Sequence, residues 1–149
     1  MDTMELLELL GRVDQCTRSR FLGVFPSDRI PVPRKDLEQQ YLIINLDPAS
    51  RPGSHWVAVH LKGKRGLYFD SYGKAPFIYK IRKYLDDHCD DWTFNKIQRQ
   101  SYTSTVCGQF CVVFCALRCR GLSMNRINEY LAEIGEDELN DCIINLYKQ

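Results

Sequence analysis

The run from Gln100 to Cys119 constrains the fold most, because it joins a turn-rich loop directly to a long apolar segment. It reads QSYTSTVCGQFCVVFCALRC, with neither glycine nor proline from Phe110 to Leu117. This pattern predicts a loop followed by a buried helix, with a cysteine in the first turn. A side-chain oxygen of Ser104 or Thr105 is expected to cap that helix. The positive end of the helix dipole would then favour the thiolate form of the cysteine at position 107.

Four cysteines in this run recur every four residues, so they lie along one helical face. They are Cys107, Cys111, Cys115 and Cys119. Such a stripe is typical of core packing, because cysteine is small and often buried. One zinc ion cannot bind all four, since they span about 18 Å along a helix and Zn–S bonds are only about 2.3 Å long. We predict no metal site, and Cys107 differs from the others by its place at the loop–helix junction.

The composition is that of a single domain with its own core, spanning residues 1–149. A net charge of +1 provides no global electrostatic attraction to nucleic acid or to membranes. The apolar runs are too short to span a bilayer, and residues 1–5 lack the features of a signal peptide. Seven cysteines, four of them on one predicted helix, favour reduced thiols in an intracellular compartment over a disulfide scaffold. We expect a monomer.

The hydrophobic patterning predicts an α+β fold, because the strands come first and the helices gather late. Strands are expected at 41–46, 55–61, 67–72 and 92–97, with a hairpin loop at 62–66. Helices are expected at 3–13, 76–88, from 107 to a stop at Gly121, at 123–134 and at 136–147. The segment 18–34, with one glycine and three prolines, is predicted to be mostly loop.

Acyl transfer by a cysteine needs a thiolate, a base, a group that orients the base, and donors for the oxyanion. Cys107 can be the nucleophile and His55 the base, since imidazole titrates near neutral pH. Asp70 lies at the end of the strand that follows the strand of His55, so the predicted hairpin places the two side by side. The Gln100 amide and the backbone N–H of Cys107 can stabilise the oxyanion.

Each of these residues also has a structural interpretation when it is taken alone. A histidine beside a tryptophan is often only hydrogen-bonded in the core, and Asp70 before a turn can simply form that turn. His60 is predicted on the opposite strand face from His55, and His88 lies among acidic residues as a solvated group. Gln98 is a weaker rival of Gln100. The ordered set is more specific than any of its members.

The chain also resembles the adenovirus-type cysteine proteases (adenain), which belong with the Ulp1-like SUMO and NEDD8 proteases. The resemblance covers residues 20–120 and rests on His55-Trp56, Phe69-Asp70-Ser71-Tyr72-Gly73, Gln100 seven residues before Cys107-Gly108, Phe110, and Phe21-Leu22-Gly23-Val24-Phe25. It implies a mixed central β-sheet flanked by helices, with the nucleophile at a helix start. It also implies a triad of His55, Asp70 and Cys107, with Gln100 as oxyanion donor.

This chain departs from the family at the acid position, and it is more compact, with a short tail after Cys107. The adenoviral enzymes usually have Glu at the acid position. This chain has Asp70 there, as the cellular Ulp1-like enzymes do. The adenoviral enzymes are stimulated by DNA and by a viral peptide joined to an enzyme cysteine. Cys89 matches that cysteine in spacing only, and the alternative is a plain surface thiol. A basic patch for DNA is available in Arg18, Arg20, Arg29, Arg34 and Lys35.

These observations lead to a hypothesis with two alternatives. We expect a viral thiol endopeptidase that cleaves virion precursor proteins next to small residues such as glycine, in the host nucleus and in the virion. A narrow cleft lined by Trp56 and Gly108 would suit such a substrate, because Gly108 lets a peptide backbone approach closely. The first alternative is an Ulp1-like enzyme that removes ubiquitin-like modifiers from host proteins. The second is a non-catalytic interaction or metal-binding module.

Overall fold

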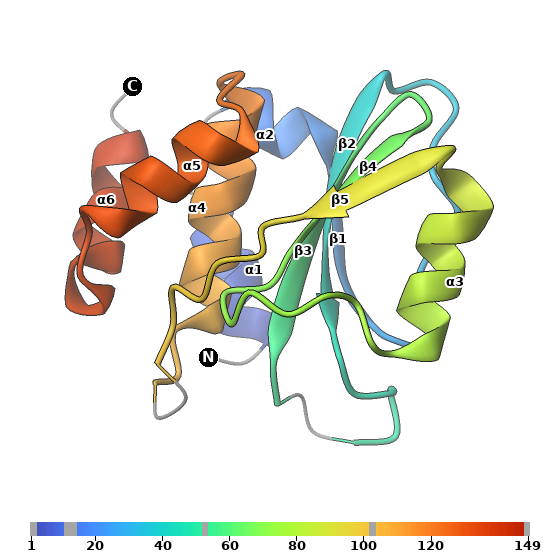
Figure 1. Cartoon of the computed structure of the whole chain (residues 1–149), viewed down its shortest axis with the longest axis horizontal. Helices are drawn as coiled ribbons and strands as arrows, with labels where there is room; N and C mark the ends of the chain where they lie inside the picture. Colours follow the sequence, from blue (N-terminus) through green and yellow to red (C-terminus); the bar gives the residue numbers. More distant parts are fainter. Residues whose placement is uncertain (1–2, 11–14, 52–53, 102–103, 148–149) are drawn as a thin grey trace.

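A computed structural model describes residues 3–10, 15–51, 54–101 and 104–147. Its centre is a five-stranded sheet in the order β1-β2-β3-β4-β5 (Figure 1). The strands are β1 (Phe21–Pro26), β2 (Gln39–Asn45), β3 (Trp56–Lys62), β4 (Arg65–Phe69) and β5 (Asp91–Phe94). The two outer pairs are parallel and the two inner pairs antiparallel, so the sheet is mixed.

Helices cover both faces of this sheet, as the α+β prediction requires (Figure 1). They are α1 (Thr3–Leu10), α2 (Gln15–Arg20), α3 (Tyr79–His88), α4 (Cys107–Cys119), α5 (Met124–Ala132), the short 3₁₀ helix η1 (Glu136–Glu138) and α6 (Leu139–Tyr147). Figure 1 shows α3 on one side and α1, α4, α5 and α6 on the other. Among these, α4 packs directly on β3.

The core consists of two layers because both faces of the central strands are buried. On one face, Ile43 and Ala58 pack against Phe114 and other apolar residues of α4. On the opposite face, Ile44 and Val57 pack toward α3. Strands buried on both faces read as continuous apolar runs, which is why residues 41–46 were recognisable as a strand.

The predicted loop at 18–34 is wrong in its first half, which forms the end of α2 and the strand β1. β1 is an edge strand whose residues are all half-buried, so its sequence carries no alternation of apolar and polar positions. Gly23 has a φ of 138° beside a register shift in the pairing with β2. Glycine at a bulge and proline at the end of an edge strand are both tolerated. Because the two residues are also common in loops, the sequence of β1 resembles that of a loop.

The helix limits agree with the prediction more closely than the helix caps do. Residues 11–13 of the first predicted helix lie outside the described residues, and α3 begins at Tyr79 instead of position 76. Ser123 caps α5 by accepting from the Arg126 N–H at 3.3 Å. The expected cap of α4 is wrong, since Val106 is the N-cap and no side chain caps the helix. Ser104 instead accepts from the Val106 N–H at 3.4 Å.

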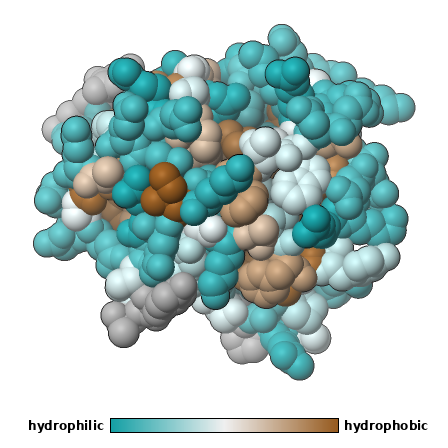
Figure 2. Space-filling model, in the orientation of Figure 1, coloured by the Kyte–Doolittle hydropathy of each residue, from teal (hydrophilic) through white to brown (hydrophobic). Residues whose placement is uncertain are grey.

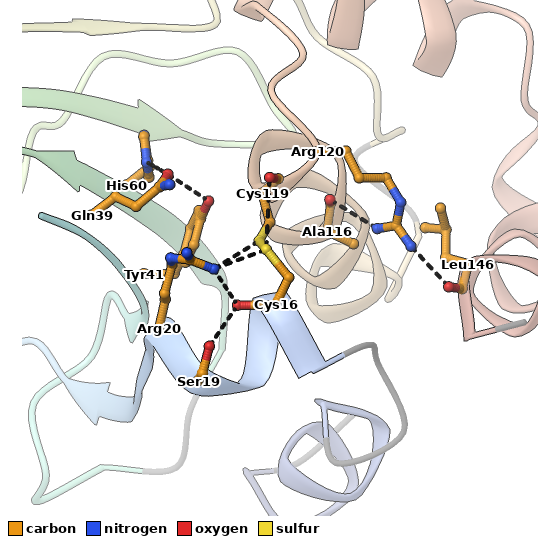
Figure 3. Close-up of a disulfide and its surroundings, with 10 residues drawn as sticks. All are labelled: Cys16, Ser19, Arg20, Gln39, Tyr41, His60, Ala116, Cys119, Arg120 and Leu146. Carbon is orange, nitrogen blue, oxygen red and sulfur yellow. Dashed lines mark hydrogen bonds between the residues drawn. A yellow bond between two sulfur atoms is a disulfide. The ribbon is translucent and has the colours of Figure 1, made fainter. Parts of the chain in front are cut away.

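The prediction of reduced thiols is wrong for Cys16 and Cys119, which form a disulfide across 103 positions of sequence (Figure 3). The bond ties α2 to the last residue of α4. The guanidinium of Arg20 lies against it, with Nη1 2.9 Å from the sulfur of Cys16 and 3.9 Å from that of Cys119. Pairing at this distance in sequence leaves no local signal. The described free cysteines are Cys89, Cys107, Cys111, Cys115 and Cys142.

The surface is predominantly hydrophilic on the face shown in Figure 2, where apolar residues form small separate groups. Across the described ranges, no helix combines the length and apolar character that a bilayer span requires. No group of three or more His, Cys, Asp and Glu side chains with the proximity needed for a metal ion occurs there either.

Candidate active site

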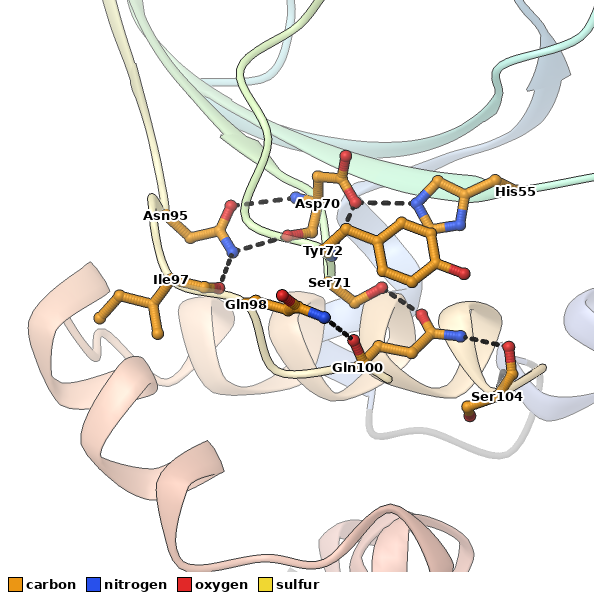
Figure 4. A network of polar contacts seen from close by, with 9 residues as sticks. All are labelled: His55, Asp70, Ser71, Tyr72, Asn95, Ile97, Gln98, Gln100 and Ser104. Carbon is orange, nitrogen blue, oxygen red and sulfur yellow. Dashed lines mark hydrogen bonds and ion pairs between the residues drawn. The ribbon is translucent and has the colours of Figure 1, made fainter. Parts of the chain in front are cut away.

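The antiparallel pairing of β3 and β4 brings His55 to Asp70. His55 comes directly before β3 and Asp70 directly after β4, so both lie at the same edge of the sheet. The Nε2 atom of His55 donates to Oδ1 of Asp70 at 2.8 Å (Figure 4). Both residues are buried, with 7% and 1% of their surface exposed. A short hydrogen bond away from water fixes the ring orientation and leaves Nδ1 free for another partner.

Asp70 is held by its neighbours in the chain and by one distant residue. Its Oδ1 also accepts from the Tyr72 N–H at 2.9 Å. The side chain of Asn95 brackets its backbone, accepting from the Asp70 N–H at 3.0 Å and donating to the Asp70 carbonyl at 2.7 Å (Figure 4). The Tyr72 ring stacks on the His55 ring with centroids 4.4 Å apart. The imidazole is therefore fixed both in its plane and across it.

Cys107 is the first residue of α4 and contributes the sulfur at the same edge of the sheet. The His55 side chain and backbone groups of Trp56 and Gly108 lie near enough to its sulfur to lower the pKa of the thiol. The imidazole is therefore hydrogen-bonded to a carboxylate and within electrostatic reach of a sulfur. An imidazole on the far side of the sheet would have excluded catalysis by this pair.

The electrostatics of this group favour a thiolate–imidazolium pair. Burial by itself would lower the pKa of His55, but hydrogen bonds to Asp70 and Cys107 outweigh it and raise the pKa to about 9. Burial would also raise the pKa of Cys107, yet the hydrogen bond from His55 and those from the backbone lower it below the usual thiol value. Each charged group thus stabilises the other.

Gln100 lies in the loop before α4, buried to 1% exposure, and both ends of its amide are engaged (Figure 4). Its Oε1 accepts from the Ser71 hydroxyl at 2.5 Å and its Nε2 donates to the Ser104 carbonyl at 3.0 Å. An amide nitrogen carries two hydrogens, so these contacts use one of the two N–H groups of Gln100. Gln98, the weaker rival, donates to the Gln100 carbonyl and braces the same loop.

Backbone groups of Trp56 and Gly108, the predicted cleft residues, contribute to the lowered pKa of Cys107. Gly108 is the second residue of α4 and is buried. The Trp56 side chain lines a cavity of about 240 Å³ between the ends of β1 and β2 and the loop that follows β2.

Cys89 lies in the core layer between the sheet and α3, on the opposite sheet face from the layer that contains Cys107. It is only 9% exposed, so the alternative of a plain surface thiol is wrong. Burial, together with the carboxylate of Asp91, raises the pKa of its thiol. A disulfide between this cysteine and an activating peptide stays a prediction, and it would require the thiol to become exposed.

The two other histidines lie away from the site. His60 is buried near the other end of β3, and His88 is half-buried at the end of α3. Cys111 and Cys115 are completely buried, and burial raises the pKa of both thiols. Core packing is therefore the correct interpretation for these two.

Sequence reasoning missed the supporting residues of the site. Tyr72 and Ser71 stand in the quoted Phe69–Gly73 motif, which was a usable signal, although no role was assigned to them. Asn95 had no signal, because an asparagine near a strand end is typical of any turn.

No protein-family model and no curated protein matches this chain. Among solved structures, the ASFV pS273R protease matches at 18% identity with a TM-score of 0.50, over 73% of this chain and 44% of that one. The Chlamydia abortus effector protein ChlaDUB matches at 13% identity with a TM-score of 0.44, over 74% of this chain and 64% of that one. The chain thus spans less than two thirds of either protein. The match to the ASFV protease confirms the predicted adenain and Ulp1-like fold.

Proposed function

We propose that the chain is a cysteine peptidase with Cys107 as nucleophile, His55 as general base and acid, and Asp70 as the group that orients the imidazole. One observation carries the proposal: the His55 imidazole is hydrogen-bonded to Asp70 at 2.8 Å and lies near enough to Cys107 for each to shift the pKa of the other. The opposite pKa shifts of His55 and Cys107 support it, because they favour the reactive thiolate near neutral pH.

The reaction would proceed in two steps. The Cys107 sulfur attacks the carbonyl carbon of a peptide bond, and the oxyanion accepts hydrogen bonds from the Cys107 backbone N–H and the free N–H of Gln100. The His55 imidazolium gives its proton to the departing amine, which leaves a thioester on Cys107. A water molecule then loses a proton to His55, attacks the thioester, and releases the acid and the thiolate.

The substrate class is proposed on weaker grounds. An endopeptidase that cleaves viral precursor proteins next to small residues accords with the fold of the ASFV protease and with the burial of Cys107. Removal of ubiquitin-like modifiers is the second candidate, favoured by an aspartate at the acid position. Activation by a peptide or by DNA, and residence in a host nucleus, stay predictions.

The test uses the purified chain with the disulfide between Cys16 and Cys119 intact. Wild type is expected to hydrolyse a fluorogenic glycine-containing peptide and to be alkylated by iodoacetamide selectively at Cys107, as located by mass spectrometry. Cys107→Ala should lower hydrolysis by a factor of more than about 10³ without unfolding the chain. Cys115→Ala is the matched control, since it removes a buried thiol from the same helix and should keep full activity.

Substrate choice is tested in parallel with SUMO-, NEDD8- and ubiquitin-linked fluorogenic substrates. Faster turnover of one of these than of the peptide would replace the endopeptidase proposal by the second candidate. Full activity in Cys107→Ala would refute the peptidase proposal. Absence of selective alkylation in wild type, or stoichiometric zinc in the purified protein, would favour the non-catalytic module.

A further inference from the structure

The turn after Asp70 is fastened to the segment that leads to Cys107. Ser71 follows Asp70 directly and is completely buried. Its backbone carbonyl accepts from the N–H groups of Arg99 at 2.7 Å and of Gln100 at 2.9 Å. Its hydroxyl donates to Oε1 of Gln100 at 2.5 Å (Figure 4). Ser71 therefore binds Gln100 through both its backbone and its side chain.

Gly73 lets the two segments approach this closely. Its φ of 72° lies in the left-handed region that favours glycine. A Cβ atom at this position would lie 2.5 Å from the backbone carbon of Ile97 and 2.6 Å from the backbone nitrogen of Gln98. Both distances are too short for a real side chain. The backbones of the turn 70–73 and of the segment 97–100 are thus in direct contact.

The orientation of the Gln100 amide follows from the chemistry of its two partners. The Ser104 carbonyl can only accept, so the amide atom that faces it at 3.0 Å is the nitrogen, Nε2. The amide oxygen then faces Ser71, whose hydroxyl is able to donate. Gln100 is only 1% exposed, so its amide is shielded from water. A buried acceptor without a donor is unfavourable, and the amide therefore depends on the Ser71 hydroxyl for its position.

The same hydrogen bonds continue to the helix that carries Cys107. Ser104 accepts from the amide nitrogen of Gln100 through its carbonyl, and its hydroxyl accepts from the Val106 N–H at 3.4 Å. Val106 is the N-cap of α4, directly before Cys107. The Gln100 amide thus has its oxygen toward the turn after Asp70 and its nitrogen toward the loop before Cys107. Its orientation decides which of the two sides receives a donor.

We propose that Ser71 is a positioning residue for the peptidase reaction. Its hydroxyl holds the amide oxygen of Gln100 and thereby keeps the amide nitrogen on the side of Cys107, where an oxyanion needs a donor. Ser71 acts through Gln100 and not on the reacting atoms. This inference rests on the proposed peptidase function and deepens it, because it names the group on which the oxyanion donor depends.

The test is a double-mutant cycle with Ser71→Ala, Gln100→Ala and the variant that carries both changes. The proteins are assayed for kcat and KM with the fluorogenic substrate that wild type hydrolyses fastest, and for the rate of Cys107 alkylation by iodoacetamide. Ser123→Ala is the control with the same chemical change, because the Ser123 hydroxyl accepts from the Arg126 N–H at 3.3 Å at the start of α5. Circular dichroism establishes that each variant is folded.

Ser71→Ala is expected to lower kcat about tenfold with KM within about twofold of wild type, because the oxyanion forms only in the transition state. Gln100→Ala should lower kcat by a factor of about 10², the effect of removing one oxyanion donor. The double variant should match Gln100→Ala within about twofold, since Ser71 acts only through Gln100. Alkylation should keep its wild-type rate in all three, because it forms no oxyanion. Ser123→Ala should change neither rate more than about twofold.

Ser71→Thr separates the effect of the hydroxyl from that of truncation. It keeps the donor and should hydrolyse the substrate faster than Ser71→Ala. A folded Ser71→Thr that is no faster than Ser71→Ala would overturn the proposal. Unfolding of both variants would also overturn it, because Ser71 would then serve the fold alone.

The cycle can contradict the positioning role in other ways. Wild-type kcat in Ser71→Ala would refute it, and so would losses that multiply in the double variant, since Ser71 would then act independently of Gln100. Slower alkylation in Ser71→Ala would place the effect at Cys107 itself. An unchanged kcat in Gln100→Ala would end this inference while the peptidase proposal stands. If wild type hydrolyses no substrate, the proposed function itself fails, and the inference fails with it.

Discussion

Two buried histidines at opposite ends of β3 have opposite electrostatic environments. His55 donates to the carboxylate of Asp70, and its pKa is raised to about 9. His60 accepts at Nδ1 from the guanidinium of Arg118 at 3.2 Å, and burial and then this positive charge lower its pKa to about 3. Both rings stack on a tyrosine, Tyr72 for His55 and Tyr41 for His60.

The difference shows that burial alone does not give a histidine its chemistry. The charge of the neighbouring side chain decides whether the ring is an imidazolium that can give a proton or a neutral group that only accepts from an arginine. The two cysteines at the ends of α4 also differ in their surroundings. Cys107 at its start contacts His55, whereas Cys119 at its end is closed in a disulfide next to Arg118, in the same region as His60 (Figure 3).

Exchanging each histidine tests this comparison and has the largest expected effect. His55→Ala should lower kcat/KM for peptide hydrolysis by a factor of about 10³, because general acid–base catalysis contributes about 10²–10⁴. His60→Gln keeps an acceptor for Arg118 and should leave hydrolysis within about twofold of wild type. Circular dichroism would establish that both variants are folded. Equal losses of activity in the two variants would contradict the assigned roles.

The pH dependence sharpens the comparison further. The raised pKa of His55 keeps the ring protonated below about pH 9, so hydrolysis should fall about tenfold per pH unit above that value. Alkylation of Cys107 by iodoacetamide needs only the thiolate, whose pKa is lowered, and should not fall in the same range. The two rates are measured from pH 6 to about pH 10.5.

Asp70→Asn provides the control for this pH profile. Removing the carboxylate removes one cause of the raised pKa of His55. The pH above which hydrolysis begins to fall, its alkaline limit, should therefore be lower in this variant. An unchanged limit in Asp70→Asn would show that the limit does not belong to His55.

The disulfide at the other end of α4 should affect stability and leave hydrolysis almost unchanged. Cys16→Ser removes a link that closes a loop of 103 positions, and such links typically contribute about 2–4 kcal/mol to the free energy of unfolding. Urea denaturation of wild type with and without dithiothreitol should show the same difference. Loss of hydrolysis in the folded Cys16→Ser variant would instead couple the two ends of the helix.

The sequence by itself determined the central strands, the buried helix α4 and the ordered set of His55, Asp70, Gln100 and Cys107. Apolar runs report burial directly, and the order of chemically matched residues restricts the class of reaction. The mixed sheet and its adenain and Ulp1-like fold were also expected from the resemblance in these motifs.

Only the tertiary structure decided the rest. The edge strand β1 has no alternating pattern, and the pairing of Cys16 with Cys119 joins residues far apart in sequence. The hydrogen bonds of the Asn95 side chain to the backbone of Asp70 also depend on neighbours brought together by the fold. Hydrogen bonds and charges act through space, so their partners cannot be read from positions along the chain.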